Sequence, residues 1–151
     1  MNELTPTQCL ALLSTARVGH LAVISEGDPY VAPISFVLIG EAIYVRTASG
    51  KRIEAMKANP RVCFEVSKMD DATGDWESVI VWSTAEFVDD DRTSQEVIAA
   101  FHDKYRDVLG SPLNPGRVVP EDIYVVRFPI EISEGRSSGS YFSMRSRPGR
   151  L

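Results

Sequence analysis

The sequence has few of the residues that build metal centres and nucleophilic active sites. It contains two cysteines, Cys9 and Cys63, and two histidines, His20 and His102. Their spacing fits no zinc or iron–sulfur pattern, and neither histidine stands in a recognisable nucleophile motif. The acidic run at residues 89–91 is typical of a helix start, which favours negative charge. Because neither a metal site nor an acid–base pair is evident, an enzyme of this sequence would depend on a cofactor for its chemistry.

Long apolar runs are also missing. No stretch of the sequence approaches the 18 apolar residues expected of a membrane-spanning helix. The first residues, MNELTPTQ, lack the basic start and apolar run of a signal peptide. Two cysteines without a disulfide framework are typical of reduced thiols. We therefore expect a cytoplasmic protein that does not insert into a membrane.

The charge is unevenly distributed along the chain. The formal net charge is −5, and residues 1–134 hold 12 of the 16 basic residues and all 21 acidic ones. An acidic surface of this kind argues against binding to nucleic acid. Residues 135–151 are rich in arginine and serine and contain no acid. We expect one domain over residues 1–134, followed by a flexible tail over residues 135–151.

Short runs of β-type residues make up most of the chain. Period-2 patterns and intervening turn residues predict six strands, over residues 18–24, 30–39, 42–47, 61–69, 76–88 and 123–132. Residues 17–47 are expected to form a three-strand antiparallel meander. Strands and long helices do not alternate, which argues against a doubly wound parallel fold. The sequence therefore predicts a mainly β protein, a six-stranded antiparallel barrel with short helices in its connections.

Three short helices are expected between these strands. Thr5 and Gln8 predict a capping box at the start of a helix over residues 6–14. A second helix over residues 50–58 should end before Pro60, since the residue preceding a proline leaves the helical region. Thr93 and Glu96 predict another capping box, for a helix that continues to about Tyr105.

The most unusual segment is RTASGKRIEAMKANPR at residues 46–61, which carries five basic residues and one acid in an acidic protein. Lys51 and Arg52 fall at the predicted helix start, where a positive side chain costs a few tenths to about 1 kcal/mol. A bound phosphate would reverse the sign of that effect. Thr47 and Ser49 add hydroxyl groups, and Gly50 allows close approach of the backbone. The alternative is ordinary surface charge, because the segment is neither a Walker loop nor a GxGxxG motif.

A longer stretch, GDPYVAPISFVLIGEAIYVRTASGKRIEAMKANPRVCFEV at residues 27–66, resembles the pyridoxamine 5′-phosphate oxidase-like flavoproteins, which are FMN-binding split barrels. The similarity extends over about residues 15–130. The matching features are a strand with Pro29-Tyr30, a strand ending in Thr47, the cluster at residues 49–52, and the helix end at residues 59–62 (Asn-Pro-Arg-Val).

The resemblance implies a split β-barrel that forms a homodimer with two FMN sites at the subunit interface. It assigns contacts to the FMN phosphate to Thr47, Ser49, Gly50, Lys51 and Arg52. It assigns backbone contacts to the flavin ring to Pro33, Ile34, Ser35 and Phe36, and an approach from the partner subunit to Ser78. Arg46 stands where relatives often have tyrosine or histidine, so it could reinforce phosphate binding or signal a different ligand.

Two departures bear on the activity. The arginine and lysine that flank the second strand in pyridoxamine phosphate oxidases proper correspond to Ala32 and Val37, and the C-terminal Trp/Arg substrate motif is not visible. The chain is therefore more similar to the nitroimidazole-resistance and general-stress branches, for which reduction of a small acceptor is expected.

Three functions remain open from the sequence. The first is an FMN-dependent oxidoreductase that passes electrons to a small-molecule acceptor. The second is a deazaflavin-dependent reductase of the same fold, because a longer anionic cofactor would suit the additional cation Arg46. The third is a non-enzymatic flavin- or haem-binding protein or sensor. His20, expected in the core or at an interface, and His102, expected on an exposed helix face, are the only histidine candidates for haem.

Overall fold

The computed structural model describes residues 2–109 and 123–138, which fold into short strands and four helices. The helices are α1 (Pro6–Thr15), α2 (Lys51–Ala58), α3 (Asp91–Lys104) and α4 (Arg106–Leu109). The strands are β1 (Asn2–Glu3), β2 (Gly19–Ser25), β3 (Asp28–Ile34), β4 (Val37–Ile39), β5 (Ala42–Ala48), β6 (Arg61–Met69), β7 (Trp76–Thr84), β8 (Glu86–Phe87), β9 (Ile123–Pro129) and β10 (Ile132–Ser137). None of the helices in these ranges has the length and apolar character needed to span a membrane.

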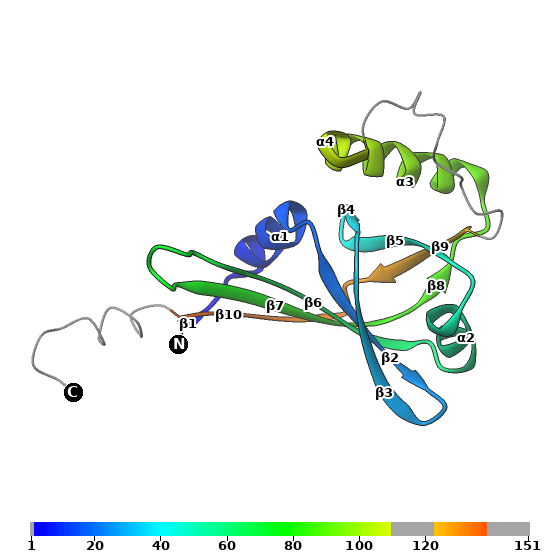
Figure 1. Cartoon of the computed structure of the whole chain (residues 1–151), viewed down its shortest axis with the longest axis horizontal. Helices are drawn as coiled ribbons and strands as arrows, with labels where there is room; N and C mark the ends of the chain where they lie inside the picture. The colour runs from blue at the N-terminus through cyan, green and yellow to red at the C-terminus, as the bar shows by residue number, and fades with distance from the viewer. Residues whose placement is uncertain (1, 110–122, 139–151) are drawn as a thin grey trace, which may run out of the picture.

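The strands form two antiparallel sheets that enclose one core. The larger sheet has the order β1-β10-β7-β6-β2-β3, and the smaller has the order β4-β5-β9-β8. Figure 1 shows α3 lying over β4 and β5, with α1 and α2 on different sides of the barrel. The expectation of a mainly β, antiparallel fold with short connecting helices is thus confirmed.

The number of strands is higher than the six predicted, because three of the predicted strands change sheets partway along and the short β1 was not predicted. The predicted strand over residues 30–39 becomes β3 and β4, which lie in different sheets and are separated by Ser35 and Phe36. Residues 76–88 likewise become β7 and β8, and residues 123–132 become β9 and the start of β10. The predicted three-strand meander is right in its antiparallel pairs, β2 with β3 and β4 with β5, but wrong as a single sheet, because the middle strand is divided between the two sheets.

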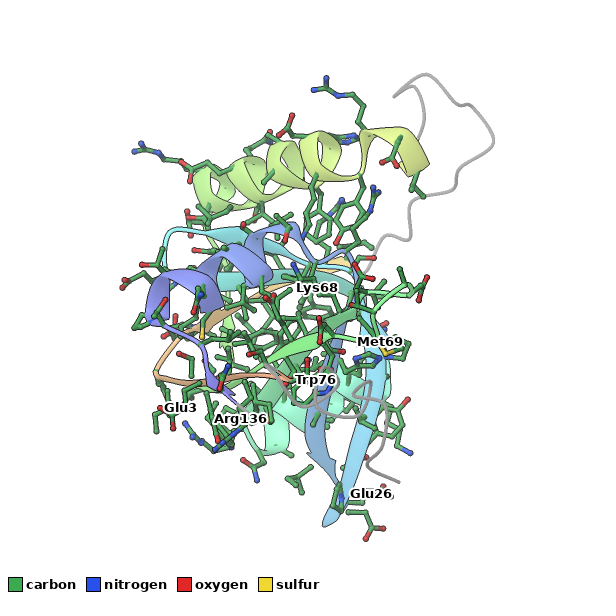
Figure 2. All side chains as sticks on the ribbon, turned by 90° about the vertical axis from the view of Figure 1, so that its left-hand side faces the viewer. Glu3, Glu26, Lys68, Met69, Trp76 and Arg136 are labelled. Carbon is green, nitrogen blue, oxygen red and sulfur yellow. The ribbon has the colours of Figure 1, made fainter. Side chains whose placement is uncertain are left out.

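The boundary predicted between domain and tail is also wrong. β10 runs to Ser137 and pairs with β7, so residues 135–137 belong to the larger sheet. Gly135 allows this pairing, because a Cβ at that position would lie 2.4 Å from Cys9 Sγ. Glu3 of β1 and Arg136 are neighbours at this edge of the sheet (Figure 2). The remainder of the predicted tail, residues 139–151, lies outside the described residues.

Aromatic side chains fill the space between the sheets. The rings of Phe36 and Phe64 meet edge to face with centroids 4.9 Å apart, and Phe128 lies 6.3 Å from Phe64. All three side chains are fully buried. Gly19 is required beside them, since a Cβ there would lie 2.1 Å from the Phe64 ring. α1 and α2 complete this core with apolar residues that include Leu13 and Met56.

A second, smaller apolar cluster lies between α3 and the four-stranded sheet. Val97 and Phe101 of α3, with the adjacent Tyr105, pack against residues that include Val37 and Tyr44. The helix is capped by Asp90, whose carboxylate accepts a 2.8 Å hydrogen bond from the backbone nitrogen of Thr93. The predicted capping box at Thr93 is therefore wrong by three residues.

The other two helices follow the prediction closely. In α1 the Thr5 hydroxyl accepts from the Gln8 backbone nitrogen at 3.2 Å, while the Gln8 side chain accepts from the Thr5 backbone nitrogen at 2.8 Å. This confirms the predicted capping box. α2 ends at Ala58, just before Asn59 and Pro60, as the proline requires.

Candidate cofactor-binding site

A surface pocket of about 330 Å³ lies between edge strand β3 and the connection from β5 to α2. It is lined by Tyr30, Ala32, Pro33, Thr47, Ala48, Ser49, Gly50, Lys51 and Arg52. All five residues to which the sequence assigned phosphate contacts are in this lining. The strand β5 brings Thr47 to the pocket, and the helix α2 begins immediately after Gly50.

The start of α2 differs from the starts of the other two long helices. Thr5 and Asp90 cap α1 and α3 with side-chain hydrogen bonds. In the part of the chain that the structure describes, α2 begins at Gly50 without such a cap. The first backbone N–H groups of a helix have no partner within the helix. Those of α2 are therefore open to an external acceptor.

Gly50 adopts a backbone conformation that favours glycine. Its φ of 155° and ψ of −161° lie in a region that residues with a Cβ rarely enter. A Cβ added there would meet nothing within 4 Å, so the requirement comes from the backbone itself. The glycine thus allows the chain to turn from β5 into α2 while leaving the space beside the helix start free.

Two cations border the same space and are held by neighbouring groups. The Lys51 ammonium lies 4.7 Å from the centroid of the Tyr30 ring. The Arg52 guanidinium donates a long hydrogen bond, 3.4 Å, to the carbonyl oxygen of Pro33. With the exposed Ser49 hydroxyl and the uncapped helix start, they form a donor set suited to a phosphate.

Thr47 has a different environment from the other members of this set. It is 5% exposed, and its hydroxyl donates to the carbonyl oxygen of Ala48 over 3.4 Å. Most of the side chain therefore serves as part of the pocket wall. Its hydroxyl is therefore less accessible to a ligand than the exposed hydroxyl of Ser49.

Arg46 faces away from this pocket. In β5, Ile43 and Val45 belong to the barrel core, whereas Ala42 and Tyr44 belong to the cluster under α3. Successive side chains of a strand point to opposite faces, so Arg46 lies on the α3 side. Its guanidinium carbon is 5.9 Å from the centroid of Phe101. The suggestion that Arg46 reinforces phosphate binding is not supported by this geometry.

Of the four residues assigned to the flavin ring, only Pro33 lines the pocket. Ile34 is 7% exposed and packs in the core, whereas Ser35 is exposed. The backbone nitrogen of Phe36 already donates to the Tyr105 hydroxyl at 3.0 Å. The Phe36 backbone is therefore engaged within the chain, and a direct contact from it to a ligand would require that bond to break.

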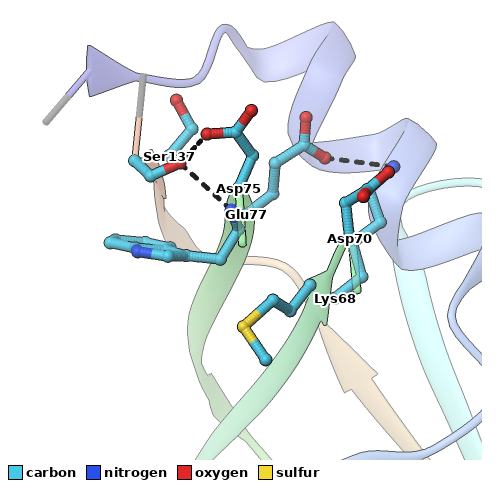
Figure 3. Close-up of a pocket in the computed structure, with 8 residues that line it drawn as sticks. Lys68, Asp70, Asp75, Glu77 and Ser137 are labelled. Carbon is cyan, nitrogen blue, oxygen red and sulfur yellow. Dashed lines mark hydrogen bonds and ion pairs between the residues drawn. The ribbon is translucent and has the colours of Figure 1, made fainter. Parts of the chain in front are cut away.

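Ser78 does not line this pocket. It belongs to β7 and lies on the outer face of the larger sheet, opposite Ser67 and Arg136. A separate pocket of about 470 Å³ lies near the start of β7, lined by Lys68, Met69, Asp70, Asp75, Trp76, Glu77, Ser137 and Ser138 (Figure 3). Its polar groups pair with one another, as Lys68 does with Glu77 at 3.3 Å. We therefore assign this second pocket a structural role within the chain.

The two histidines lie apart from both pockets. His20 is on the outer face of β2, about half exposed, with its Nδ1 2.9 Å from the carboxylate of Glu65. The expectation that His20 could be a core residue is wrong, whereas His102 is exposed on α3 as expected. Across residues 2–109 and 123–138, no group of three or more histidines, cysteines and carboxylates is arranged to hold a metal ion.

The sequence interpretation missed Tyr30, Ala32 and Ala48 as pocket residues. The sequence does indicate the first two. Tyr30 belongs to the Pro29-Tyr30 pair of the family resemblance, and Ala32 shares its face because residues two apart on a strand point to the same side. Tyr30 is the most informative of the three, since its ring supports the Lys51 ammonium.

The comparison with known families agrees with the fold. The profile described as pyridoxamine 5′-phosphate oxidase matches residues 5–137, which is most of the chain. The chain therefore belongs to the pyridoxamine 5′-phosphate oxidase-like family of split barrels, as the resemblance indicated.

Solved structures show the same architecture. A FAD-binding protein from Mesorhizobium loti is 26% identical, with a TM-score of 0.73 over 90% of this chain and 96% of that one. The FAD binding protein from Mycobacterium smegmatis is 25% identical, with a TM-score of 0.66 over 90% and 98%. A proposed 5-nitroimidazole antibiotic resistance protein from Bacteroides thetaiotaomicron shares the fold at 17% identity, with a TM-score of 0.70 over 90% and 86%.

A curated relative aligns over a shorter region. An uncharacterized protein of Rhizobium meliloti (strain 1021) is 26% identical over 74 residues, which cover 49% of this chain and 48% of the relative. The alignment thus spans about half of that protein's length.

Proposed function

We propose that this protein binds FMN and passes electrons from the reduced flavin to a small acceptor. The observation that carries the proposal is the pocket in which an uncapped helix start, Lys51, Arg52 and the Ser49 hydroxyl meet beside β3. Membership of a flavin-binding fold family and the likeness to two FAD-binding proteins support a flavin as the ligand.

The protein groups would bind and orient the cofactor. Lys51 and Arg52 would neutralise the charge of the phosphate, and the N–H groups at the start of α2 would donate to its oxygens. Gly50 would leave room for the phosphate beside the helix start, and Tyr30 and Pro33 would form the adjoining wall. The bound flavin would supply the electron-transfer chemistry.

The pocket lining itself favours this division of roles. Among the described residues that line it there is no carboxylate, imidazole or thiol. The lining therefore lacks the carboxylate or imidazole that would activate its serine or threonine hydroxyl as a nucleophile. Its chemistry is that of anion binding, which is the role expected of a protein that holds a redox cofactor.

FMN is favoured over a deazaflavin by the position of Arg46. The argument for a longer anionic cofactor rested on an additional cation near the phosphate. Arg46 instead lies near Phe101 on the α3 side of β5 and does not line the pocket. The cations of the lining, Lys51 and Arg52, suit a single terminal phosphate.

We propose in addition that two chains form a homodimer through the outer face of the larger sheet. A row of apolar side chains crosses five strands on that face, because the strand register aligns Val31, Ala22, Cys63, Trp82 and Ile132. Val31 is 63% exposed and Ile132 is 60% exposed. A contiguous exposed apolar surface of this kind is typical of an interface. Ser78 lies on the same face, so such a dimer would bring it toward the partner chain.

The test of the proposed function is direct. The purified protein should be yellow, and mass analysis of the ligand released on denaturation should find FMN. Titration of the apoprotein with FMN, FAD and a deazaflavin should rank FMN first. A colourless protein that binds none of them would overturn the proposal. A protein that binds FMN but whose reduced flavin is reoxidised by no acceptor at turnover rates would be a flavin-binding protein or sensor instead.

A further inference from the structure

Side chains at the end of α3 hold the connection between β3 and β4 through several contacts to Phe36. The Tyr105 hydroxyl accepts from the backbone nitrogen of Phe36 at 3.0 Å and lies 2.8 Å from the carbonyl oxygen of Phe36. Lys104 Nζ donates to the same carbonyl oxygen at 3.0 Å, and it lies 3.8 Å from the centroid of the Phe36 ring. Both polar groups of the Phe36 backbone are thus bound by side chains almost 70 residues further along the chain.

This arrangement is largely enclosed. Tyr105 is 6% exposed and Phe36 is fully buried. The Tyr105 hydroxyl also lies 2.7 Å from the carbonyl oxygen of Arg17, so its proton is shared between two acceptors. Buried polar groups that lose a partner carry the full cost of their desolvation. The position of Phe36 therefore depends strongly on Tyr105.

The other end of the same segment is held at the candidate cofactor site. Arg52 donates to the carbonyl oxygen of Pro33, and Pro33 lines the pocket. Between them, Ile34 is anchored in the barrel core. Residues 33–36 are therefore fixed at one end by the cofactor site and at the other end by α3.

We propose that Tyr105 and Lys104 are positioning residues. Through Phe36 they hold the segment 33–36, and with it the pocket residue Pro33, in place, so that the end of α3 influences the affinity for the flavin. Neither side chain lines the pocket, and both act through Phe36. The identity of the ligand in this proposal rests on the proposed function.

The proposal has a consequence for pH dependence. The pKa of Lys104 is lowered from 10.5 to about 8, first because the ammonium is desolvated and second because Arg17 is positively charged. The centroid of the Tyr105 ring lies 5.5 Å from the Lys104 ammonium, and burial raises the pKa of its phenol. Arg17 is itself paired with Asp107 at 2.7 Å. Lys104 is therefore the group in this cluster that loses its proton near pH 8.

The two effects of that proton have opposite signs. Between pH 8 and 10.5 the unfolded chain binds the Lys104 proton and the folded chain does not, so Lys104 makes the fold more stable as pH rises through this range. The charged ammonium forms the stronger hydrogen bond to the Phe36 carbonyl, so its hold on this segment weakens over the same range. The affinity for FMN should therefore fall as pH rises through about 8, while the Lys104 contribution to stability rises.

The principal test compares Tyr105→Phe with Tyr44→Phe. Tyr44 lies in the same cluster under α3, but its hydroxyl accepts from Arg127 Nε at 3.2 Å and is not one of the groups bonded to Phe36. Both variants remove one phenol hydroxyl from that cluster. We expect Tyr105→Phe to lower FMN affinity about tenfold and to speed amide hydrogen exchange at Ile34 and Ser35 in the apoprotein. Tyr44→Phe should leave both quantities at wild-type values.

A second pair of variants isolates the ammonium. Lys104→Met should bind FMN more weakly at neutral pH, and its affinity should then show no further fall near pH 8. Lys104→Arg, which keeps its charge, should retain its FMN affinity up to pH 9. Wild-type FMN affinity in Tyr105→Phe, or a pH step that survives in Lys104→Met, would overturn the positioning role and leave the proposed function standing. If the wild-type protein binds no FMN, the proposed function fails. The positioning role can still be tested in that case, because unchanged amide hydrogen exchange at Ile34 and Ser35 in the Tyr105→Phe apoprotein would overturn it.

Discussion

The ammonium of Lys51 lies 4.7 Å from the centroid of the Tyr30 ring, across the candidate pocket from the strand that carries the tyrosine. Tyr30 is half-buried and packs against the barrel core, so its ring is a fixed support. A lysine side chain is otherwise flexible and loses conformational freedom when it binds a ligand. Contact with the ring reduces that loss, because it holds the ammonium at the helix start before a ligand arrives.

Replacement of Tyr30 by leucine should weaken FMN binding. A cation–π contact at a partly exposed site contributes about 0.5–1 kcal/mol, so the dissociation constant should rise roughly two- to fivefold. Tyr124→Leu is the matched control, since the Tyr124 ring supports Lys57 at 5.1 Å and does not line the pocket. Quenching of flavin fluorescence would measure both variants. Equal affinities in the two would show that the Tyr30 ring has no part in binding.

Lys51→Ala and Arg52→Ala should each lower FMN affinity by about 10- to 100-fold. Charge-assisted hydrogen bonds contribute roughly 1.5–3 kcal/mol, and both side chains stand beside the uncapped helix start. Lys57→Ala removes a similar charge from the last turn of the same helix and should leave affinity unchanged. All three side chains are at or near the protein surface on α2, so each substitution should change the free energy of unfolding by less than about 0.5 kcal/mol.

Calorimetric titration with FMN at two salt concentrations would check this prediction. The affinity of the wild-type protein should fall with salt, and that dependence should be smaller in the Lys51 and Arg52 variants. If both variants retain wild-type affinity, the basic cluster at residues 46–61 is ordinary surface charge.

Gly50→Ala should destabilise the fold and weaken binding together. The backbone conformation of Gly50 costs a residue with a Cβ about 1–3 kcal/mol, although the added methyl group would meet no atom within 4 Å. Urea unfolding should therefore show a loss of this size, and FMN affinity should fall as the loop shifts to relieve the strain. Gly40→Asn is a suitable control, because its φ of 60° is one that asparagine tolerates. A Gly50→Ala protein with wild-type stability would contradict the conformational requirement.

The part of the site that could be predicted from the sequence consists of residues that are close together in the sequence. Residues 47–52 come together because one strand end, one glycine and one helix start follow each other, and local rules describe each of them. The position of Arg46 also follows from a local rule. A step of one residue along a strand reverses the face, so the strand predicted over residues 42–47 is enough to place Arg46 and Thr47 on opposite faces.

The remainder depends on contacts between distant segments. The apolar pattern of residues 30–39 continues through the point where the chain leaves one sheet for the other, so nothing in the local sequence marks Ser35 and Phe36 as a corner. The engagement of the Phe36 backbone by Tyr105 likewise has no local signal, because the two residues are brought together only when α3 packs on the smaller sheet.

Substitution of a charged residue on the outer face of the larger sheet should separate the proposed dimer. Val31→Glu and Ile132→Glu each place a carboxylate at one end of the apolar row, where burial without a partner would be costly. Val108→Glu adds the same charge at a residue that is 71% exposed on α4. In sedimentation velocity, the wild-type protein and Val108→Glu should run at twice the mass of the chain, and the two variants of the face at the mass of one chain. The family resemblance implies flavin sites at the subunit interface, so those two variants should also bind FMN more weakly. Wild-type protein that sediments as a monomer yet binds FMN tightly would contradict the dimer and show that one chain forms a sufficient site.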